Sequence, residues 1–216
     1  QTLANIREMK RKFEMFMLCI GWFAILAQFV LMIQNRLVDI PETIIRYFSF
    51  FTILTNILVA LFFTVTAFQV KKFPYKLLST SGAITAVTAF ILIVGLVYQI
   101  ALRSIWEPTG LQFIVDEILH TIIPLFMLIY WFFNVTKDDL QLRTVFKWLV
   151  YPVTYIIFII VRGYLSGYYP YPFLNIKEIG FEKTMMNITI IIALAITIFV
   201  VLSSIGNYIV KIQRKK

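Results

Sequence analysis

The fold follows from the stretch Asp116-Glu117-Ile118-Leu119-His120-Thr121-Ile122-Ile123-Pro124-Leu125-Phe126-Met127-Leu128-Ile129-Tyr130-Trp131, which holds the only histidine of the chain. Its apolar part predicts a helix that crosses a membrane, with His120 inside the hydrocarbon or close to its edge. A titratable side chain at that depth is costly unless it faces the protein interior. We therefore expect other polar groups of the protein to gather around His120.

Two carboxylates precede the histidine by one helical turn. Asp116 is four residues and Glu117 three residues before His120, and both spacings place side chains on one helix face. A carboxylate in such a position fixes the tautomer of the imidazole and raises its basicity. Either acid can fill this role. The alternative interpretation is a solvated helix start, in which both acids favour the helix dipole.

The composition predicts an all-α, polytopic membrane protein. The chain has 216 residues, 60% of them hydrophobic, and a mean hydropathy of +0.85. A soluble domain of this size does not need so much apolar surface. The apolar runs are continuous rather than alternating, which favours membrane helices over a membrane barrel. We expect one transmembrane domain over residues 1–216, with six helices at roughly 15–33, 43–68, 77–102, 111–133, 147–165 and 183–210.

Lys and Arg are concentrated on one side of the predicted helices. They cluster in the N-terminal arm, in the loops at 69–76 and 134–147, and in the C-terminal tail with Lys211, Arg214, Lys215 and Lys216. Because cytoplasmic segments carry the excess of basic residues, both termini are predicted to be cytoplasmic. The second and fourth helices then start at the outer surface, with Thr52 and His120 each ~10 Å below it. Equal depth on two helices predicts that these side chains meet.

Several other kinds of site are disfavoured. The net charge of +9 does not indicate a nucleic-acid partner, because the basic residues sit in short clusters beside the spans. Cys19 is the only cysteine and lies in the first span, so no intrachain disulfide is expected. One histidine without a thiolate cluster provides too few ligands for a metal, and no cofactor is indicated. The sequence carries no signal for an oligomeric state.

A polar stripe crosses the second predicted helix at Ser49, Thr52, Thr55 and Asn56. At 100° per residue these side chains fall within ~120° of arc. The simplest interpretation is hydrogen bonding between helices, or a threonine that bonds the carbonyl of its own preceding turn. For His120 the simplest interpretation is likewise a core histidine bonded to a carbonyl.

A second interpretation joins the stripe to the histidine. A threonine hydroxyl becomes nucleophilic when a base takes its proton, and an imidazole held by a third group is the usual base. We predict that Thr52 is the nucleophile, that His120 is the base, and that Asp116 or Glu117 supports it. Ser49, Thr55 and Asn56 are predicted to support the site, with Asn56, Ser49 or a neighbouring hydroxyl as the candidate to stabilise an oxyanion.

The longest outer loop, at about residues 163–182, contains Gly163-Tyr164-Leu165-Ser166-Gly167-Tyr168-Tyr169-Pro170-Tyr171-Pro172-Phe173. Such aromatic residues are typical of the belt at a membrane interface. Alternatively, the prolines stiffen the loop into a rim over a cavity, with Tyr171 as a substrate-binding residue. Arg162 precedes the loop, and it either extends to the headgroups or anchors a lipid carboxylate or phosphate.

Three short motifs resemble the androgen-induced protein / FAR-17a family. They are Phe51-Thr52, Leu119-His120-Thr121-x-x-Pro124, and Tyr171-Pro172-Phe173-Leu174 followed by Ile179-Gly180. The string from Arg162 to Phe173 is still more similar to prokaryotic six-helix relatives. The resemblance spans the second to sixth helices and implies a hydrolase of fatty acid esters of hydroxy fatty acids. It also implies Thr52 and His120 as the catalytic pair. Asp116-Glu117 departs from the animal members, which look polar there but not doubly acidic.

Together these features predict an integral membrane Thr/His hydrolase, whose lipid ester substrate enters sideways from the bilayer. If the source is prokaryotic, we expect the protein in the cytoplasmic membrane. Two other function classes stay open. One is a small transporter or proton-coupled carrier that uses His120 and the neighbouring acids as a relay. The other is a non-catalytic lipid-binding or scaffold protein.

Overall fold

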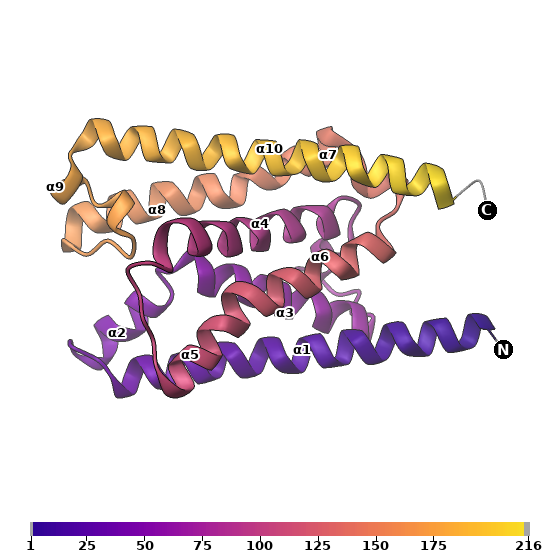
Figure 1. The fold of residues 1–216 in the computed structure, drawn as a ribbon, viewed down its shortest axis with the longest axis horizontal. Helices are drawn as coiled ribbons and strands as arrows, with labels where there is room; N and C mark the ends of the chain where they lie inside the picture. The colour runs from indigo at the N-terminus through magenta and orange to yellow at the C-terminus, as the bar shows by residue number, and fades with distance from the viewer. Residues whose placement is uncertain (1, 214–216) are drawn as a thin grey trace.

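The computed structural model describes residues 2–213, with side chains from residue 4 onward, and is a bundle of helices (Figure 1). Six of its helical segments are long and apolar enough to cross a membrane, which confirms the predicted number of spans. The chain is thus a multi-pass integral membrane protein. Arg214, Lys215 and Lys216 of the basic tail lie outside the described residues.

The bundle has one central helix and two long outer ones. α1 (Thr2–Gln34) and α10 (Phe181–Gln213) run along opposite sides, and α4 (Ala83–Val97) lies between them (Figure 1). The most apolar window of the α4 span is 72% buried, against 28% in α1 and 22% in α10. The two outer helices therefore present most of their apolar side chains to lipid. The start of α1 and the end of α10 lie at the same end of the bundle, as six spans require (Figure 1).

The second span is not the single helix predicted for residues 43–68. It is broken into α2 (Ile40–Tyr47) and α3 (Phe51–Phe68), of which only α3 is a candidate span. α2 starts at Asp39, whose side chain accepts a hydrogen bond from the Glu42 N–H at 3.0 Å. Between the two helices Phe50 is extended, with φ −82° and ψ 125°. Thr52 therefore stands in the first turn of α3 rather than two turns into a longer helix.

A tyrosine from a distant helix makes this break stable. α8 (Val150–Ser166) carries Tyr155, whose hydroxyl donates to the Ser49 carbonyl at 2.8 Å. The same hydroxyl accepts from the Phe51 N–H at 3.2 Å. Buried backbone groups freed from a helix must find other partners, and Tyr155 supplies one on each side of the break. Local sequence contains no sign of this partner, because it lies about a hundred residues away along the chain.

The third and fourth spans each contain a π-turn. α4 continues into the π-turn η2 (Tyr98–Leu102), and α5 (Gly110–Glu117) continues through η3 (Ile118–Ile122) into α6 (Ile123–Asn134). π-turns are rare, and many occur at functional sites. Here η3 contains His120. The fourth span lies close to its predicted bounds, whereas the third starts at Ala83, six residues after the predicted start at residue 77.

The remaining elements form the last two spans and the ends of the bundle. The fifth span joins α7 (Leu142–Phe146), η5 (Lys147–Leu149) and α8, and the sixth span is α10. η4 (Lys137–Leu140) lies in the 134–147 loop predicted to be cytoplasmic. η1 (Tyr75–Ser79) extends from the predicted 69–76 loop into residues that were predicted to begin the third helix. At the other end, the segment after α8 is shorter than predicted and contains η6 (Pro172–Leu174) and α9 (Ile176–Ile179).

Candidate active site

Thr52 and His120 meet inside the bundle, as the sequence predicted. The Thr52 Oγ1 lies 3.4 Å from the His120 Nε2, within hydrogen-bonding distance. Both residues are buried, with exposed fractions of 9% and 8%. The predicted reason was partly wrong, because Thr52 begins a helix instead of lying two turns into one. The pair forms because the break before α3 places its first turn beside the π-turn η3.

The backbone fixes the tautomer of the histidine. The His120 Nδ1 is 2.9 Å from the carbonyl oxygen of Asp116. A carbonyl can only accept, so Nδ1 carries the proton and donates it. In the neutral ring Nε2 is then the unprotonated nitrogen, and it faces the hydroxyl of Thr52. This is the tautomer that a general base acting on Thr52 requires.

The two acids before His120 have separate environments. Asp116 is buried, and its Oδ1 lies 3.5 Å from the His120 Nδ1, where it stabilises a positive charge on the ring. Its Oδ2 has no hydrogen-bond partner among the described residues. Glu117 pairs instead with Arg103 at 2.6 Å and accepts from the Thr121 hydroxyl at 2.9 Å. Asp116 is thus the carboxylate beside the histidine, and the prediction that Glu117 is an equal candidate was wrong.

Two residues of the third span pack against His120, one on its ring and one on its backbone. The ring of Tyr98 stacks on it, with centroids 4.0 Å apart and an interplanar angle of 15°. Gly95 lies one turn earlier on the same helix face. A Cβ at Gly95 would come within 3.0 Å of the His120 carbonyl oxygen and 3.3 Å of Pro124, so glycine permits this close approach. The sequence analysis assigned neither Gly95 nor Tyr98 to the site, although their spacing of three residues places them on one helix face.

Tyr171 completes the immediate surroundings of Thr52. Its hydroxyl accepts from the Thr52 N–H at 3.3 Å and lies 3.5 Å from the Thr52 Oγ1. Tyr171 precedes η6 in the segment between α8 and α10, and its burial raises the pKa of the phenol above the ordinary value. The phenol is therefore protonated at neutral pH. Its position fits the predicted rim over a cavity better than a belt at the membrane interface.

The other residues of the polar stripe hold the structure together. Ser49 lies in the break before α3, and its hydroxyl donates to the Ile45 carbonyl at 2.7 Å. The Thr55 hydroxyl bonds the Tyr151 hydroxyl at 2.9 Å. The Asn56 Nδ2 donates to the carbonyls of Thr52 and Leu119, at 2.9 and 3.3 Å. The donors of Ser49 and Asn56 are therefore engaged within the protein, and of the predicted oxyanion donors a neighbouring hydroxyl is left.

Arg162 lies apart from the candidate catalytic pair. It is only 9% exposed, so it does not extend to the headgroups as the simpler interpretation supposed. Its Nη2 lies 2.9 Å from Glu42 of α2, and its Nη1 donates to the Tyr168 carbonyl at 3.3 Å. Hydrogen bonds from Arg46, together with Arg162, hold the pKa of Glu42 below its ordinary value. Arg162 therefore ties the end of α8 to α2 and the outer segment.

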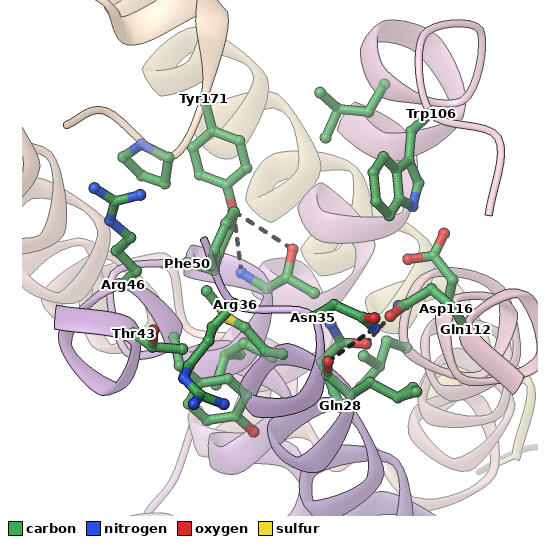
Figure 2. A pocket seen from close by; sticks show the side chains of 18 of the residues that line it. Gln28, Asn35, Arg36, Thr43, Arg46, Phe50, Trp106, Gln112, Asp116 and Tyr171 are labelled. Atoms are coloured by element: carbon green, nitrogen blue, oxygen red, sulfur yellow. Dashed lines mark hydrogen bonds between the residues drawn. The ribbon is translucent and has the colours of Figure 1, made fainter. Parts of the chain in front are cut away.

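A cavity of about 590 Å³ opens onto Thr52 and His120. Figure 2 shows Asp116 and Tyr171 around the cavity, with Arg46 near Tyr171 and Arg36 on the side away from Asp116. Gln28 of α1 and Gln112 of α5 also line the cavity, joined by a hydrogen bond of 2.7 Å. Aliphatic and aromatic side chains make up most of the remaining wall. A molecule with a long apolar part and a polar group can be accommodated there.

The donor atoms of the site suit proton transfer and nucleophilic attack. Within residues 2–213, no three His, Cys, Asp or Glu side chains come together as metal ligands do. Comparison with family models, with curated proteins and with solved structures finds no match for this chain.

Proposed function

We propose that this protein is a membrane-embedded hydrolase of lipid esters, with Thr52 as nucleophile and His120 as general base. The observation that carries the proposal is the buried pair of Thr52 and His120. The tautomer of His120 is fixed by its hydrogen bond to the Asp116 carbonyl. A hydroxyl, an imidazole and an orienting group are the parts of a hydrolase triad, and the 3.4 Å between Thr52 Oγ1 and His120 Nε2 is slightly longer than the ~2.6–3.2 Å typical of such pairs, as is common without substrate. The proposal also agrees with the family resemblance of the sequence.

In the acylation step, His120 Nε2 takes the Thr52 proton while Oγ1 attacks the ester carbonyl. The carbon–oxygen bond to the alcohol part then breaks, and His120 returns the proton to the leaving alkoxide. The Asp116 carboxylate, at 3.5 Å from Nδ1, stabilises the imidazolium formed between these two transfers. The products of this half of the reaction are an alcohol and an acyl group esterified to Thr52.

In the deacylation step, His120 takes a proton from a water molecule that attacks the acyl-threonine. The bond from the acyl carbon to Thr52 Oγ1 breaks, and the proton passes from His120 back to Thr52. The carboxylic acid is released and the free enzyme is restored. Each step uses His120 first as a base and then as an acid, so one ring serves the whole cycle.

Tyr171 is the residue best placed to stabilise the oxyanion. Its oxygen accepts the Thr52 N–H, which leaves the phenolic proton available. The phenol oxygen lies 3.5 Å from Oγ1, next to which the negative oxygen of the tetrahedral intermediate would form, so its proton can be donated there. A donor aimed at developing charge in a dry site is worth about 10²–10³ in rate.

The test combines turnover and covalent capture in purified protein. Single-turnover release of product from a fluorogenic acyl ester is expected, together with a mass increase at Thr52 after reaction with a fluorophosphonate. If the parent hydrolyses no ester, and liposomes show His120-dependent proton uptake, the carrier interpretation replaces the hydrolase. If neither activity occurs, a lipid-binding or scaffold role replaces it.

A further inference from the structure

Thr52 stands between two cavities of different character. Besides the larger cavity, a narrow cleft of about 80 Å³ lies between α4, α8 and α10. Thr52, Leu102 and Tyr171 line both spaces. His120 and Asp116 line only the larger one. A ligand bound at the Thr52 hydroxyl can therefore place one of its two parts in each cavity.

The cleft suits a hydrocarbon chain. Its lining is aliphatic or aromatic except for the hydroxyls of Thr52, Tyr155 and Tyr171. The Tyr155 hydroxyl already bonds the Ser49 carbonyl and the Phe51 N–H. No charged side chain lines the cleft, so a charged or strongly polar group placed there would lose its hydration without compensation. The larger cavity, by contrast, has Arg36, Arg46 and Asp116 in its wall.

We infer that the narrow cleft binds the acyl chain of the ester, while the alcohol part occupies the larger cavity. This inference rests on the proposed function, because it assigns the two arms of the ester from the position of the base. His120 must return its proton to the leaving oxygen, so the leaving alcohol lies on the His120 side of Thr52. That side is the larger cavity, and the acyl chain is left with the cleft.

The second half of the reaction requires the same assignment. The attacking water must also contact His120, and it takes the position that the alcohol has vacated in the larger cavity. If the acyl chain filled the larger cavity, it would stand between His120 and the water. The dry cleft keeps the chain apart from that path, so acyl-chain length is set by the residues that line the cleft.

Ala195 of α10 provides the sharpest test. It lines the cleft and is only 2% exposed, so Ala195→Leu fills space that the chain would use. Ala193 lies on an exposed face of the same helix and does not line the cleft, so Ala193→Leu is the matched control. The substrates are 4-nitrophenyl acetate, octanoate and palmitate, which share one leaving group. We expect Ala195→Leu to lower kcat/KM for the two longer esters by about tenfold or more, with acetate little changed.

A covalent readout gives the same comparison without turnover. Fluorophosphonates with a methyl or a dodecyl chain on phosphorus react with loss of fluoride and add mass to Thr52. Ala195→Leu should slow labelling by the dodecyl probe and leave labelling by the methyl probe near the parent rate. Ile191→Ala, which widens the cleft instead of filling it, covers the case of a misfolded Ala195 variant. It should improve the use of branched acyl chains.

A variant of the larger cavity completes the design. Met32 lines only that cavity, so Met32→Ala should change the preference among acetate esters of different alcohols but not among acyl lengths. The inference is overturned if Ala195→Leu leaves the chain-length profile unchanged, or if Met32→Ala shifts it. In both cases labelling of Thr52 would persist, and the hydrolase proposal would stand. Absence of labelling by either probe would remove both proposals together.

Discussion

The ring of Tyr98 lies flat against the ring of His120, with centroids 4.0 Å apart. The stack places an aromatic side chain of one π-turn on the base carried by the other. An imidazole held on one side by a ring and at Nδ1 by a carbonyl has little freedom to rotate. Substitution of Tyr98 therefore tests how much the fixed orientation of His120 contributes to the proposed reaction rate.

We expect Tyr98→Ala to lower kcat by about tenfold, because an aromatic pair contributes about 0.5–1.5 kcal/mol beyond its buried area. Tyr98 also lines the larger cavity, so the comparison with Tyr98→Phe, rather than KM, isolates the effect of the stack. Tyr98→Phe keeps the stack and should retain most of the activity. Single-turnover rates across a pH series distinguish positioning from a general loss of structure. A Tyr98→Phe protein as impaired as Tyr98→Ala would contradict a role based on stacking.

Replacement of either member of the catalytic pair should abolish hydrolysis. Thr52→Ala and His120→Ala are each expected to lower the rate by ~10³ or more, because a nucleophile and its base act as one unit. For the same reason the double variant should be no slower than either single variant. Asp116→Asn should cost less, since the backbone carbonyl still orients the ring.

Thr55→Ala is the matched control for Thr52→Ala. Both threonines lie on α3, but the Thr55 hydroxyl bonds Tyr151 and does not contact His120. Thr55→Ala should cost stability more than catalysis, as measured by thermal unfolding in detergent. Loss of activity in Thr55→Ala with full activity in Thr52→Ala would move the nucleophile one turn along the helix.

The broken second span depends on Tyr155. Tyr155→Phe removes the partner of the Ser49 carbonyl and of the Phe51 N–H, and should destabilise the protein by about 1–3 kcal/mol. Activity should also fall, because the first turn of α3 positions Thr52. Tyr151→Phe is the control. Its partner is the hydroxyl of Thr55, which can turn to a carbonyl of its own helix. Equal costs for the two variants would show that the break does not need Tyr155.

The ion pair between Glu42 and Arg162 predicts a pH effect on stability. Hydrogen bonds from Arg46 and Arg162 keep the pKa of Glu42 lower in the folded protein than in the unfolded chain. The stabilisation is therefore complete above the unfolded pKa and is lost as the pH falls through the folded pKa. Glu42→Gln should be less stable at neutral pH by about 1 kcal/mol or less and lose this difference in acid. Thermal unfolding between pH 7 and pH 3 measures it.

Topology is predicted by the distribution of Lys and Arg. Both termini should face the cytoplasm, so that the catalytic pair opens toward the outer side. The start of α1 and the end of α10 already share one end of the bundle (Figure 1). Tags at each terminus should react with an impermeant reagent only after cells are permeabilised. Labelling of the tail in intact cells would place the site at the inner leaflet.

The number of spans and the meeting of Thr52 with His120 could be predicted from the sequence. Apolar runs report spans directly, since the bilayer requires their length and composition. Polar side chains that are rare within such runs must face the protein interior, which limits what His120 can meet. Neither the number of spans nor the burial of His120 depends on knowing which distant residues pack together.

The break before α3, the two π-turns and the choice between Asp116 and Glu117 could not be predicted in that way. Each depends on a partner from another helix. Tyr155 of α8 bonds the broken backbone, and Gly95 of α4 allows close approach to η3. Glu117 forms an ion pair with Arg103 instead of contacting His120. The ion pair of Arg162 with Glu42 was not predicted, because Glu42 belongs to α2, a separate helix that the sequence pattern did not distinguish from α3.

The early end of α2 has a consequence for how a lipid reaches the site. α3 has 18 residues and is ~27 Å long, close to the ~30 Å of a hydrocarbon core. If α3 alone crosses the hydrocarbon, its first turn, with Thr52, lies near the boundary between hydrocarbon and headgroups, where the ester bonds of bilayer lipids also lie. Under the proposed function, an ester would then come to Thr52 by lateral diffusion alone. No chain has to be lifted into water, a transfer that costs about 0.8 kcal/mol for every methylene exposed.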